Sequence, residues 1–129
     1  MRRRLAEYRH AVWDWNGTLL DDTWLCCDSL NLLLAEDGHP RVDPERYRRI
    51  FEFPVIKVYQ AIGFTPDEPS FRAMSVRFMA AYEARKHECG LHPGALDLLD
   101  GLSARGATHS VLSAYERTLL EATLRRYGL

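Results

Sequence analysis

The stretch of residues 10–22, HAVWDWNGTLLDD, constrains the fold of this chain more than any other part of it. Its apolar residues 11–13 end in Asp14, and Gly17 and Thr18 then turn the chain. Apolar, β-favouring residues before a glycine turn predict a buried strand that delivers a carboxylate to a loop. Ligands of open α/β sheets bind at such strand ends, so Asp14 is a candidate nucleophile, metal ligand or both.

Composition excludes several classes of protein. The 129 residues fit one domain, and 17 Lys and Arg balance 18 Asp and Glu to a formal charge of -1. The basic triplet at residues 2–4 has the character of a solvated terminus, so we expect no nucleic-acid binding. No apolar run approaches the ~18 residues of a membrane helix, and no signal-peptide core is present. We therefore expect a cytoplasmic protein without membrane contact.

Three cysteines, Cys26, Cys27 and Cys89, form neither an even disulfide framework nor a CxxC metal motif. No histidine or positive charge lies next to Cys26 or Cys27 in the sequence, so nothing there favours a reactive thiolate. The pattern predicts reduced, buried thiols.

The segment of residues 23–88 is predicted to be a run of helices, and Asp21 and Asp22 are expected to begin and cap the first of them. Residues 91–94 are predicted to form a loop, followed by a helix that ends at Gly106. The remaining elements are a strand over residues 107–112 that ends before Ser113 and a helix over residues 115–127. A parallel strand pair needs a crossover, which the helix over residues 94–105 supplies. The predicted fold class is α/β with an inserted helical cap.

These motifs resemble the haloacid dehalogenase-like hydrolase superfamily, in its phosphoglycolate-phosphatase-like branch with a helical cap. The run from Asp14 to Asp21, DWNGTLLD, is similar to the first motif of that family, and the strand that ends at Ser113 is similar to the second. Residues 91–94, LHPG, resemble the return from cap to core. The resemblance implies a Rossmann-like core, incomplete in this chain, from residues 1–22 and 90–129, and a cap from residues 23–89.

The resemblance also implies a chemistry. Asp14 would attack phosphorus to form an aspartyl-phosphate that water then hydrolyses. Mg²⁺ would bind the Asp14 carboxylate and the backbone carbonyl of Asn16 and reduce the repulsion between two anions. Loop amides, including that of Gly17, and the hydroxyls of Thr18 and Ser113 would contact the phosphoryl group, although Ser113 also fits a plain turn residue. The expected partner is a small phosphorylated metabolite.

Asn16 departs from the family pattern, which has an acid at this position that protonates the leaving oxygen. A carboxamide cannot donate and recover a proton in that way. Three interpretations stay open: a slow or specialised phosphatase, a different reaction on the same nucleophile, and a catalytically silent binding or interaction protein.

Two further expectations concern the rest of the chain. Lys57 could neutralise a substrate carboxylate or phosphate, although a solvated helix face explains this lysine equally well. The third and fourth motifs of the family, a Lys or Arg and an acidic pair, are absent after Ser113. We therefore expect a fragment, a truncated product, or a chain that self-associates or is completed by a partner through an exposed sheet edge.

Overall fold

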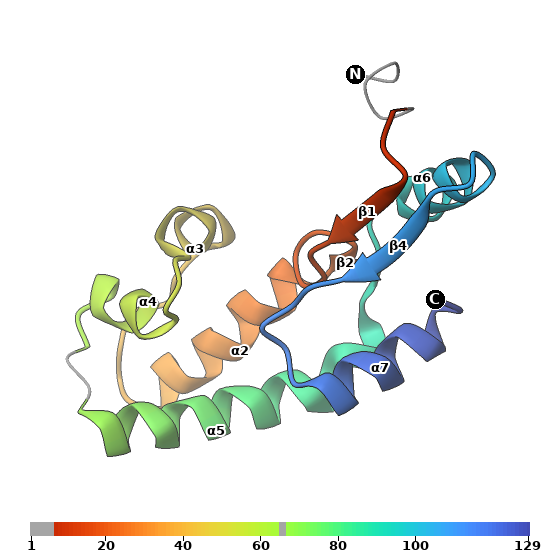
Figure 1. The fold of residues 1–129 in the computed structure, drawn as a ribbon. Coiled ribbons are helices and arrows are strands. Elements are labelled where there is room, and N and C mark those ends of the chain that lie inside the picture. Colours follow the sequence, from red (N-terminus) through yellow and green to blue (C-terminus); the bar gives the residue numbers. More distant parts are fainter. Residues whose placement is uncertain (1–6, 65–66) are drawn as a thin grey trace. The chain divides into compact units, whose positions relative to one another are not determined.

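The computed structural model describes residues 7–64 and 67–129. Its helices and strands, drawn in Figure 1, fall into two compact units. Asp22–Cys89 form the helical unit, and the chain on either side of that segment forms the sheet-bearing unit.

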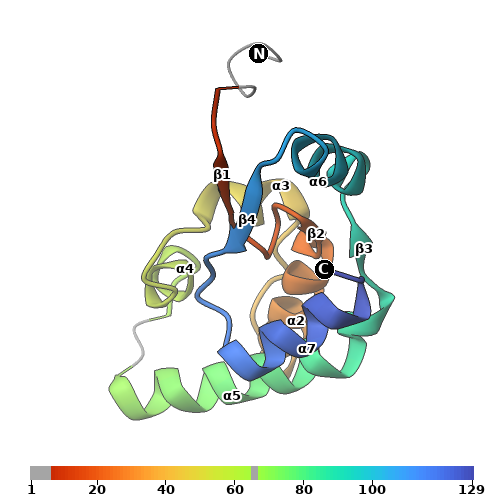
Figure 2. The ribbon, with the colours of Figure 1, turned by 45° about the vertical axis from the view of Figure 1, so that its right-hand side comes forward.

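The sheet-bearing unit is built on two parallel strands, β1 (His10–Trp13) and β4 (Thr108–Val111). Their register pairs His10 with Thr108 and Trp13 with Val111, and Figures 1 and 2 show the strands side by side. Parallel strands need a crossover, and α6 (Ala95–Ser103), which precedes β4 and contacts it, supplies a helix for it. The predicted α/β class with a helical insertion is confirmed.

The two faces of the β1–β4 pair differ. On one face, Trp13 donates its indole N–H to Nδ1 of His109 at 3.0 Å, and Nε2 of His109 lies 2.9 Å from Oγ of Ser103 in α6. On the other face, both ring nitrogens of His10 lie within hydrogen-bonding distance of hydroxyls on β4, those of Thr108 and Ser110. One face therefore packs against α6, while the other carries a polar cross-strand network. The prediction of a buried strand was wrong, because the residues of β1 are exposed or half-buried in the described structure.

A short antiparallel ladder joins β2 (Leu20–Asp21) to β3 (Gly90–Leu91). It is extended by the amide of His92, which donates to the carbonyl of Leu19 at 2.9 Å. The prediction of a loop over residues 91–94 was therefore wrong at its first residue. Strands of this length are too short for alternation to appear in a sequence.

The last helix, α7 (Arg117–Arg126), begins two residues later than predicted. The Glu116 side chain caps it by accepting the amides of Thr118 and Leu119, each at 2.9 Å. Beyond its end, the ring of Tyr127 packs against the fully buried ring of Trp15, with 5.9 Å between centroids.

The helical unit confirms the predicted run of helices. Its elements are α2 (Thr23–Glu36), α3 (Pro44–Ile50), α4 (Ile56–Ala61), α5 (Glu68–Arg85) and the 3-10 turn η1 (Lys86–Glu88). Asp43 and Asp67 cap α3 and α5, and each is followed within two residues by a proline in the first helical turn.

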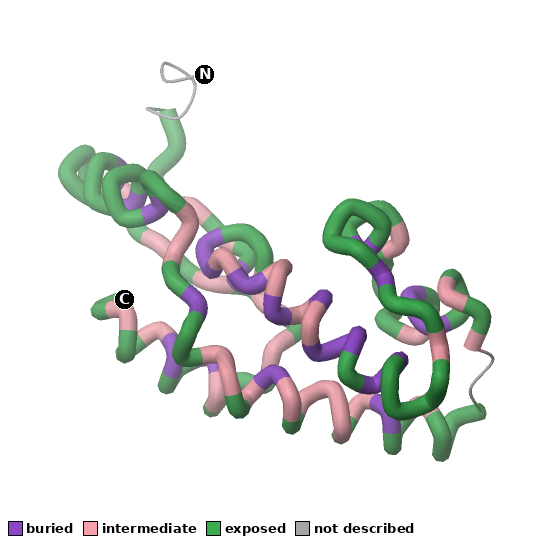
Figure 3. Tube along the Cα trace, turned by 180° about the vertical axis from the view of Figure 1, so that it is seen from behind, coloured by how far each residue is buried: buried purple, intermediate pink, exposed green. Residues whose placement is uncertain are grey.

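The core of the helical unit gathers on α2, along which Figure 3 shows a run of buried positions. This core comprises Cys27, Leu30, Leu33, Leu34, Val42, Tyr47, Val58, Tyr59 and Met74. Asn31, also buried, donates its Nδ2 to the carbonyl of Val42 and accepts the Val42 amide, both at 2.8 Å. This pair of bonds fastens the segment before α3 to α2.

Asp21 and Asp22 do not act as predicted. Asp21 lies in β2, and Asp22 occupies the N-cap position of α2 without a side-chain hydrogen bond to the helix. Instead, Oδ2 of Asp22 accepts a hydrogen bond from the Tyr82 hydroxyl of α5 at 2.6 Å. Asp22 and Tyr82 are both buried. The Asp22 carboxylate therefore bonds the Tyr82 hydroxyl of another helix in place of the backbone amides of α2.

Candidate active site

Asp14 lies directly after β1 and is exposed. The loop behind it is a tight turn in which the carbonyl of Trp15 accepts three backbone amides. The donors are Thr18 at 3.2 Å, Leu19 at 3.1 Å and Leu20 at 3.0 Å. These three amides are engaged within the turn, and the contact of other loop amides with a phosphoryl group stays a prediction.

The hydroxyl of Thr18 donates to Oδ2 of Asp14 at 2.8 Å. This bond fixes the orientation of the Asp14 carboxyl group and leaves Oδ1 as the oxygen that Thr18 does not occupy. Gly17 precedes Thr18 with φ of +71°, a value that glycine adopts without a steric penalty. Gly17 therefore allows the turn that brings the Thr18 hydroxyl within hydrogen-bonding distance of Asp14.

Asn16 is half-buried, and its backbone forms an isolated parallel bridge with Leu20. The bridge holds the Asn16 backbone in place two residues after Asp14. The side chain there is a carboxamide, which donates hydrogen bonds without releasing a proton.

Ser113 is brought to the same end of the parallel pair as Asp14. The ladder continues one step beyond Val111, because the amide of Leu112 donates to the carbonyl of Trp13 at 2.8 Å. Ser113 follows, and its Oγ accepts the amide of Tyr115 at 3.1 Å. This bond gives Ser113 the role of a turn residue, which is one of its two predicted roles. The hydrogen of the Ser113 hydroxyl remains available to another acceptor.

Lys57 lies on α4 in the helical unit and forms an ion pair with Glu52 at 2.5 Å. Both side chains are about half exposed, at 46% and 61%. The pairing satisfies the ammonium group within its own unit, which fits the interpretation of a solvated helix face.

His92 and Asp21 form a pair that sequence reasoning missed. Nε2 of His92 lies 3.7 Å from Oδ1 of Asp21, on the β2–β3 ladder. The sequence predicts Asp21 at a helix start and not on a strand next to His92. A pairing across 70 residues leaves no local signal in a sequence.

The oxygen atoms near Asp14 are of the type that binds Mg²⁺, because this ion prefers carboxylate and carbonyl oxygens, such as those of Asp14 and the Asn16 backbone. Within the described residues, no group of three or more His, Cys, Asp or Glu side chains could hold a metal ion. Asp14 and Asn16 would thus supply part of a coordination shell, with water and substrate oxygens supplying the rest.

The three cysteines are free thiols, as predicted. Cys27 and Cys89 are buried, whereas the prediction of a buried thiol was wrong for Cys26, which is half-buried at the edge of the core formed on α2. Burial raises the pKa of Cys26 to about 12, and the nearby charge of Asp22 adds to the effect. A thiol with so high a pKa is a poor nucleophile at neutral pH. Cys26 is therefore a packing residue of the helical unit.

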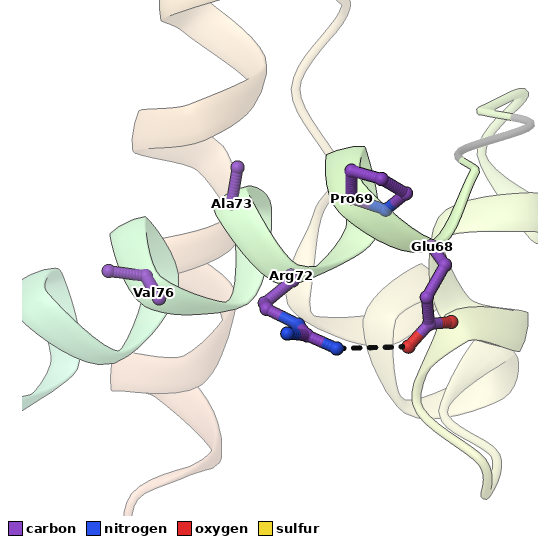
Figure 4. A pocket seen from close by; sticks show the side chains of 5 residues that line it. All are labelled: Glu68, Pro69, Arg72, Ala73 and Val76. Atoms are coloured by element: carbon purple, nitrogen blue, oxygen red, sulfur yellow. Dashed lines mark ion pairs between the residues drawn. The ribbon is translucent and has the colours of Figure 1, made fainter.

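Two shallow hollows are lined by residues other than Asp14. One follows α5, where Figure 4 shows Arg72 reaching toward Glu68, with 3.8 Å between the paired atoms, beside Pro69, Ala73 and Val76. The other is lined by Leu91, His92, Gly94, Leu96, Asp97 and Tyr127. Neither contains a residue that the sequence predicted for the site.

In the described part of the chain, no helix is long and apolar enough to span a bilayer. A family model described as haloacid dehalogenase-like hydrolase matches residues 11–129. No protein of curated function matches the chain.

Solved structures share the fold. A provisionally named haloacid dehalogenase-like hydrolase from Bacteroides fragilis aligns over 94% of this chain, with a TM-score of 0.82 and 16% identity. A provisionally named phosphoglycolate phosphatase from Lactobacillus plantarum aligns over 93%, with a TM-score of 0.77 and 18% identity. A mutant of CbbY from Rhodobacter sphaeroides, solved with xylulose-(1,5)bisphosphate, aligns over 94%, with a TM-score of 0.68 and 21% identity.

At these identities the likeness establishes the fold alone. The chain spans 58% of the Bacteroides fragilis structure, 56% of the Lactobacillus plantarum structure and 58% of the Rhodobacter sphaeroides structure. The activities and the ligand named for these structures belong to those proteins and are not assigned to this chain.

Proposed function

The chain belongs to the haloacid dehalogenase-like hydrolases, and we propose that it is a Mg²⁺-dependent phosphatase of small phosphorylated metabolites in which Asp14 is the nucleophile. In this proposal residues 1–22 and 90–129 form the catalytic core, and residues 23–89 form a cap that contributes to substrate choice. The Rossmann-like core is incomplete in this chain.

The observation that carries the proposal is the Asp14–Thr18 hydrogen bond at the end of a parallel strand. A carboxylate that is exposed and held by one oxygen can present the other to phosphorus. Attack by Asp14 forms an aspartyl-phosphate and breaks the bond to the leaving oxygen. Water then attacks the phosphorus, releases inorganic phosphate and regenerates Asp14.

The remaining site residues have supporting roles. Gly17 gives the turn its shape, and the hydroxyl hydrogen of Ser113 can interact with a phosphoryl oxygen. Thr18 would hold the Asp14 carboxylate beside the phosphoryl group that both residues contact. Asp14 and the Asn16 carbonyl would hold Mg²⁺. When bound, the metal ion offsets the repulsion between the Asp14 carboxylate and the phosphate.

A catalytically silent binding or interaction protein is the second candidate, and Asn16 is the observation that favours it. Asn16 replaces a titratable group with an amide, which removes a proton donor from the loop. The rest of the loop is compatible with either function.

An aryl phosphate assay with Mg²⁺ distinguishes the two candidates, because an aryl leaving group needs little protonation. We expect turnover that Asp14→Asn abolishes and that EDTA suppresses. Asp100→Asn is the matched control, since Asp100 is an exposed acid on α6 of the same unit. Equal rates for Asp14→Asn and the unaltered protein would refute the enzyme and leave the binding protein.

A further inference from the structure

The catalytic loop has Asp14 as its one titratable side chain. Between Asp14 and Leu20 the sequence reads DWNGTLL, so the other six side chains are aromatic, amide, hydroxyl, apolar or hydrogen. We propose, resting on the phosphatase function above, that the substrate is a phosphoryl compound whose leaving group departs as a stable anion without receiving a proton. The chemical class comprises acyl phosphates, phosphoanhydrides and aryl or enol phosphates.

The two hydroxyls near Asp14 cannot act as the missing acid. Thr18 already gives its hydrogen bond to Asp14 Oδ2 at 2.8 Å, and Ser113 is held in a turn by the amide of Tyr115. Both are ordinary alcohols, and protonation of a leaving alkoxide by an alcohol only exchanges one alkoxide for another. They can stabilise an oxygen anion by hydrogen bonding and cannot neutralise it.

The described histidines of the sheet-bearing unit are engaged elsewhere. His10 has both ring nitrogens within reach of Thr108 and Ser110. His109 accepts from Trp13 at Nδ1, which leaves its hydrogen on Nε2, beside Oγ of Ser103. Neither imidazole is placed to deliver a proton to the oxygen that leaves phosphorus.

The remaining histidine of this unit, His92, is paired with Asp21 on the β2–β3 ladder. The side-chain hydrogen bond that reaches Asp14 within the described residues comes from Thr18. Asp21, the first acid after the loop, is thus directed at an imidazole, and Asp14 has a hydroxyl as its neighbour.

Asn16 is suited to a reaction in which the leaving group departs without receiving a proton. The bridge to Leu20 fixes its backbone, and its amide can donate a hydrogen bond to an oxygen that develops negative charge. Attack by Asp14 on phosphorus breaks the bond to the leaving oxygen, which takes the electron pair and departs as an anion. Water then cleaves the aspartyl-phosphate, so the sum is ROPO₃²⁻ plus H₂O to RO⁻ plus H₂PO₄⁻. No proton transfer from the protein is needed.

The test is a series of substrates of graded leaving-group acidity, assayed with Mg²⁺ by phosphate release: acetyl phosphate, p-nitrophenyl phosphate, phenyl phosphate and glycerol 3-phosphate. We expect kcat/KM to fall steeply along this series, with the alkyl ester lowest. General acid catalysis contributes about 10²–10⁴-fold, so Asn16→Asp should raise the ratio of glycerol phosphate to acetyl phosphate turnover by about 10²-fold. Gln60→Glu, an amide-to-carboxylate change at an exposed position of α4, serves as the control for a carboxylate introduced elsewhere and should leave that ratio unchanged.

The outcomes separate the inference from the proposed function. Asp14-dependent turnover of glycerol phosphate at the rate of acetyl phosphate overturns the inference and keeps the phosphatase, because some other group then supplies the proton. No Asp14-dependent turnover of any substrate overturns both. A steep series that Asn16→Asp flattens supports both.

Discussion

Tyr82 donates its hydroxyl hydrogen to Asp22 over 2.6 Å, although the two residues lie 60 positions apart and both side chains are buried. The bond joins the first residue of the helical unit to the last turns of α5. A carboxyl group at a helix N-cap position ordinarily bonds the helix amides, and here it bonds a phenol instead. The start of α2 is therefore fastened to α5 by a buried polar contact.

Tyr82→Phe removes this hydroxyl and leaves the ring in place. We expect the free energy of unfolding to fall by about 1–3 kcal/mol, because Asp22 loses a buried hydrogen-bond partner. Urea denaturation followed by circular dichroism measures the change. Tyr59→Phe is the matched control, since Tyr59 is a buried tyrosine of the same unit whose hydroxyl has no hydrogen bond among the described residues. A similar loss in both variants would assign the effect to the ring environment.

The parts of the fold that could be predicted were those with a local signal. The apolar run before Asp14, the proline after Asp43 and the glycine at the end of a helix each act within a few residues, so the parallel pair and the helical insertion could be predicted. The Asp22–Tyr82 bond could not, because capping preference is local and the competing partner is tertiary. The position of Asp14 after a strand was also predictable, since Gly17 marks the turn.

The detail of the candidate site required the structure. The turn that directs three amides at the Trp15 carbonyl depends on how the chain closes at Gly17, and composition does not specify this closure. The Asp21–His92 pair depends on a two-residue ladder. The roles assigned to Asp14, Asn16, Gly17, Thr18, Ser113 and Lys57 stay predictions, and substitutions at Asp14, Asn16 and Thr18 test three of them.

Asn31 is a second buried polar residue with a measurable role. Its side chain makes two hydrogen bonds of 2.8 Å to the backbone of Val42. Asn31→Leu keeps a similar volume and leaves the buried amide of Val42 without its partner, while the Val42 carbonyl keeps the hydrogen bond from the Cys27 thiol. We expect a loss of about 2–4 kcal/mol in the free energy of unfolding. Leu32→Asn, at the neighbouring position that is half exposed, is the control and should change stability by less than about 0.5 kcal/mol.

The stability of the helical unit should depend on alkaline pH through Cys26. Burial, with a smaller contribution from the charge of Asp22, raises the pKa of this thiol to about 12, whereas an unfolded cysteine has a pKa of about 8.5. Below the unfolded value both states hold the proton and stability is unaffected. Above it the unfolded state loses its proton first, so the free energy of unfolding falls as pH rises toward 12.

Urea unfolding of the protein and of Cys26→Ala, measured at several pH values from about 8 to 10.5, tests this dependence. The pH slope should be shallower in Cys26→Ala, whatever its stability at the lowest pH. Some slope should persist, because burial also raises the pKa of Cys27 and of Tyr47. Identical slopes would show that Cys26 does not titrate differently in the two states.

Thr18 tests whether the hydrogen bond to Asp14 orients the nucleophile. Thr18→Val removes the hydroxyl with little change in shape, and Thr18→Ser keeps it. A hydrogen bond to a charged group contributes about 1.5–3 kcal/mol, so kcat for p-nitrophenyl phosphate should fall by about 10- to 100-fold in Thr18→Val and much less in Thr18→Ser.

A merely structural role for Thr18 would give a different result. Thr18 and Asp14 are both exposed, so the bond between them contributes little to folding, and Thr18→Val should change the free energy of unfolding by less than about 0.5 kcal/mol. A fall in kcat without a fall in stability therefore assigns the hydroxyl to orientation of Asp14. If kcat is retained in Thr18→Val while Asp14→Asn is inactive, the carboxylate attacks without this bond, and the 2.8 Å contact belongs to the resting loop alone.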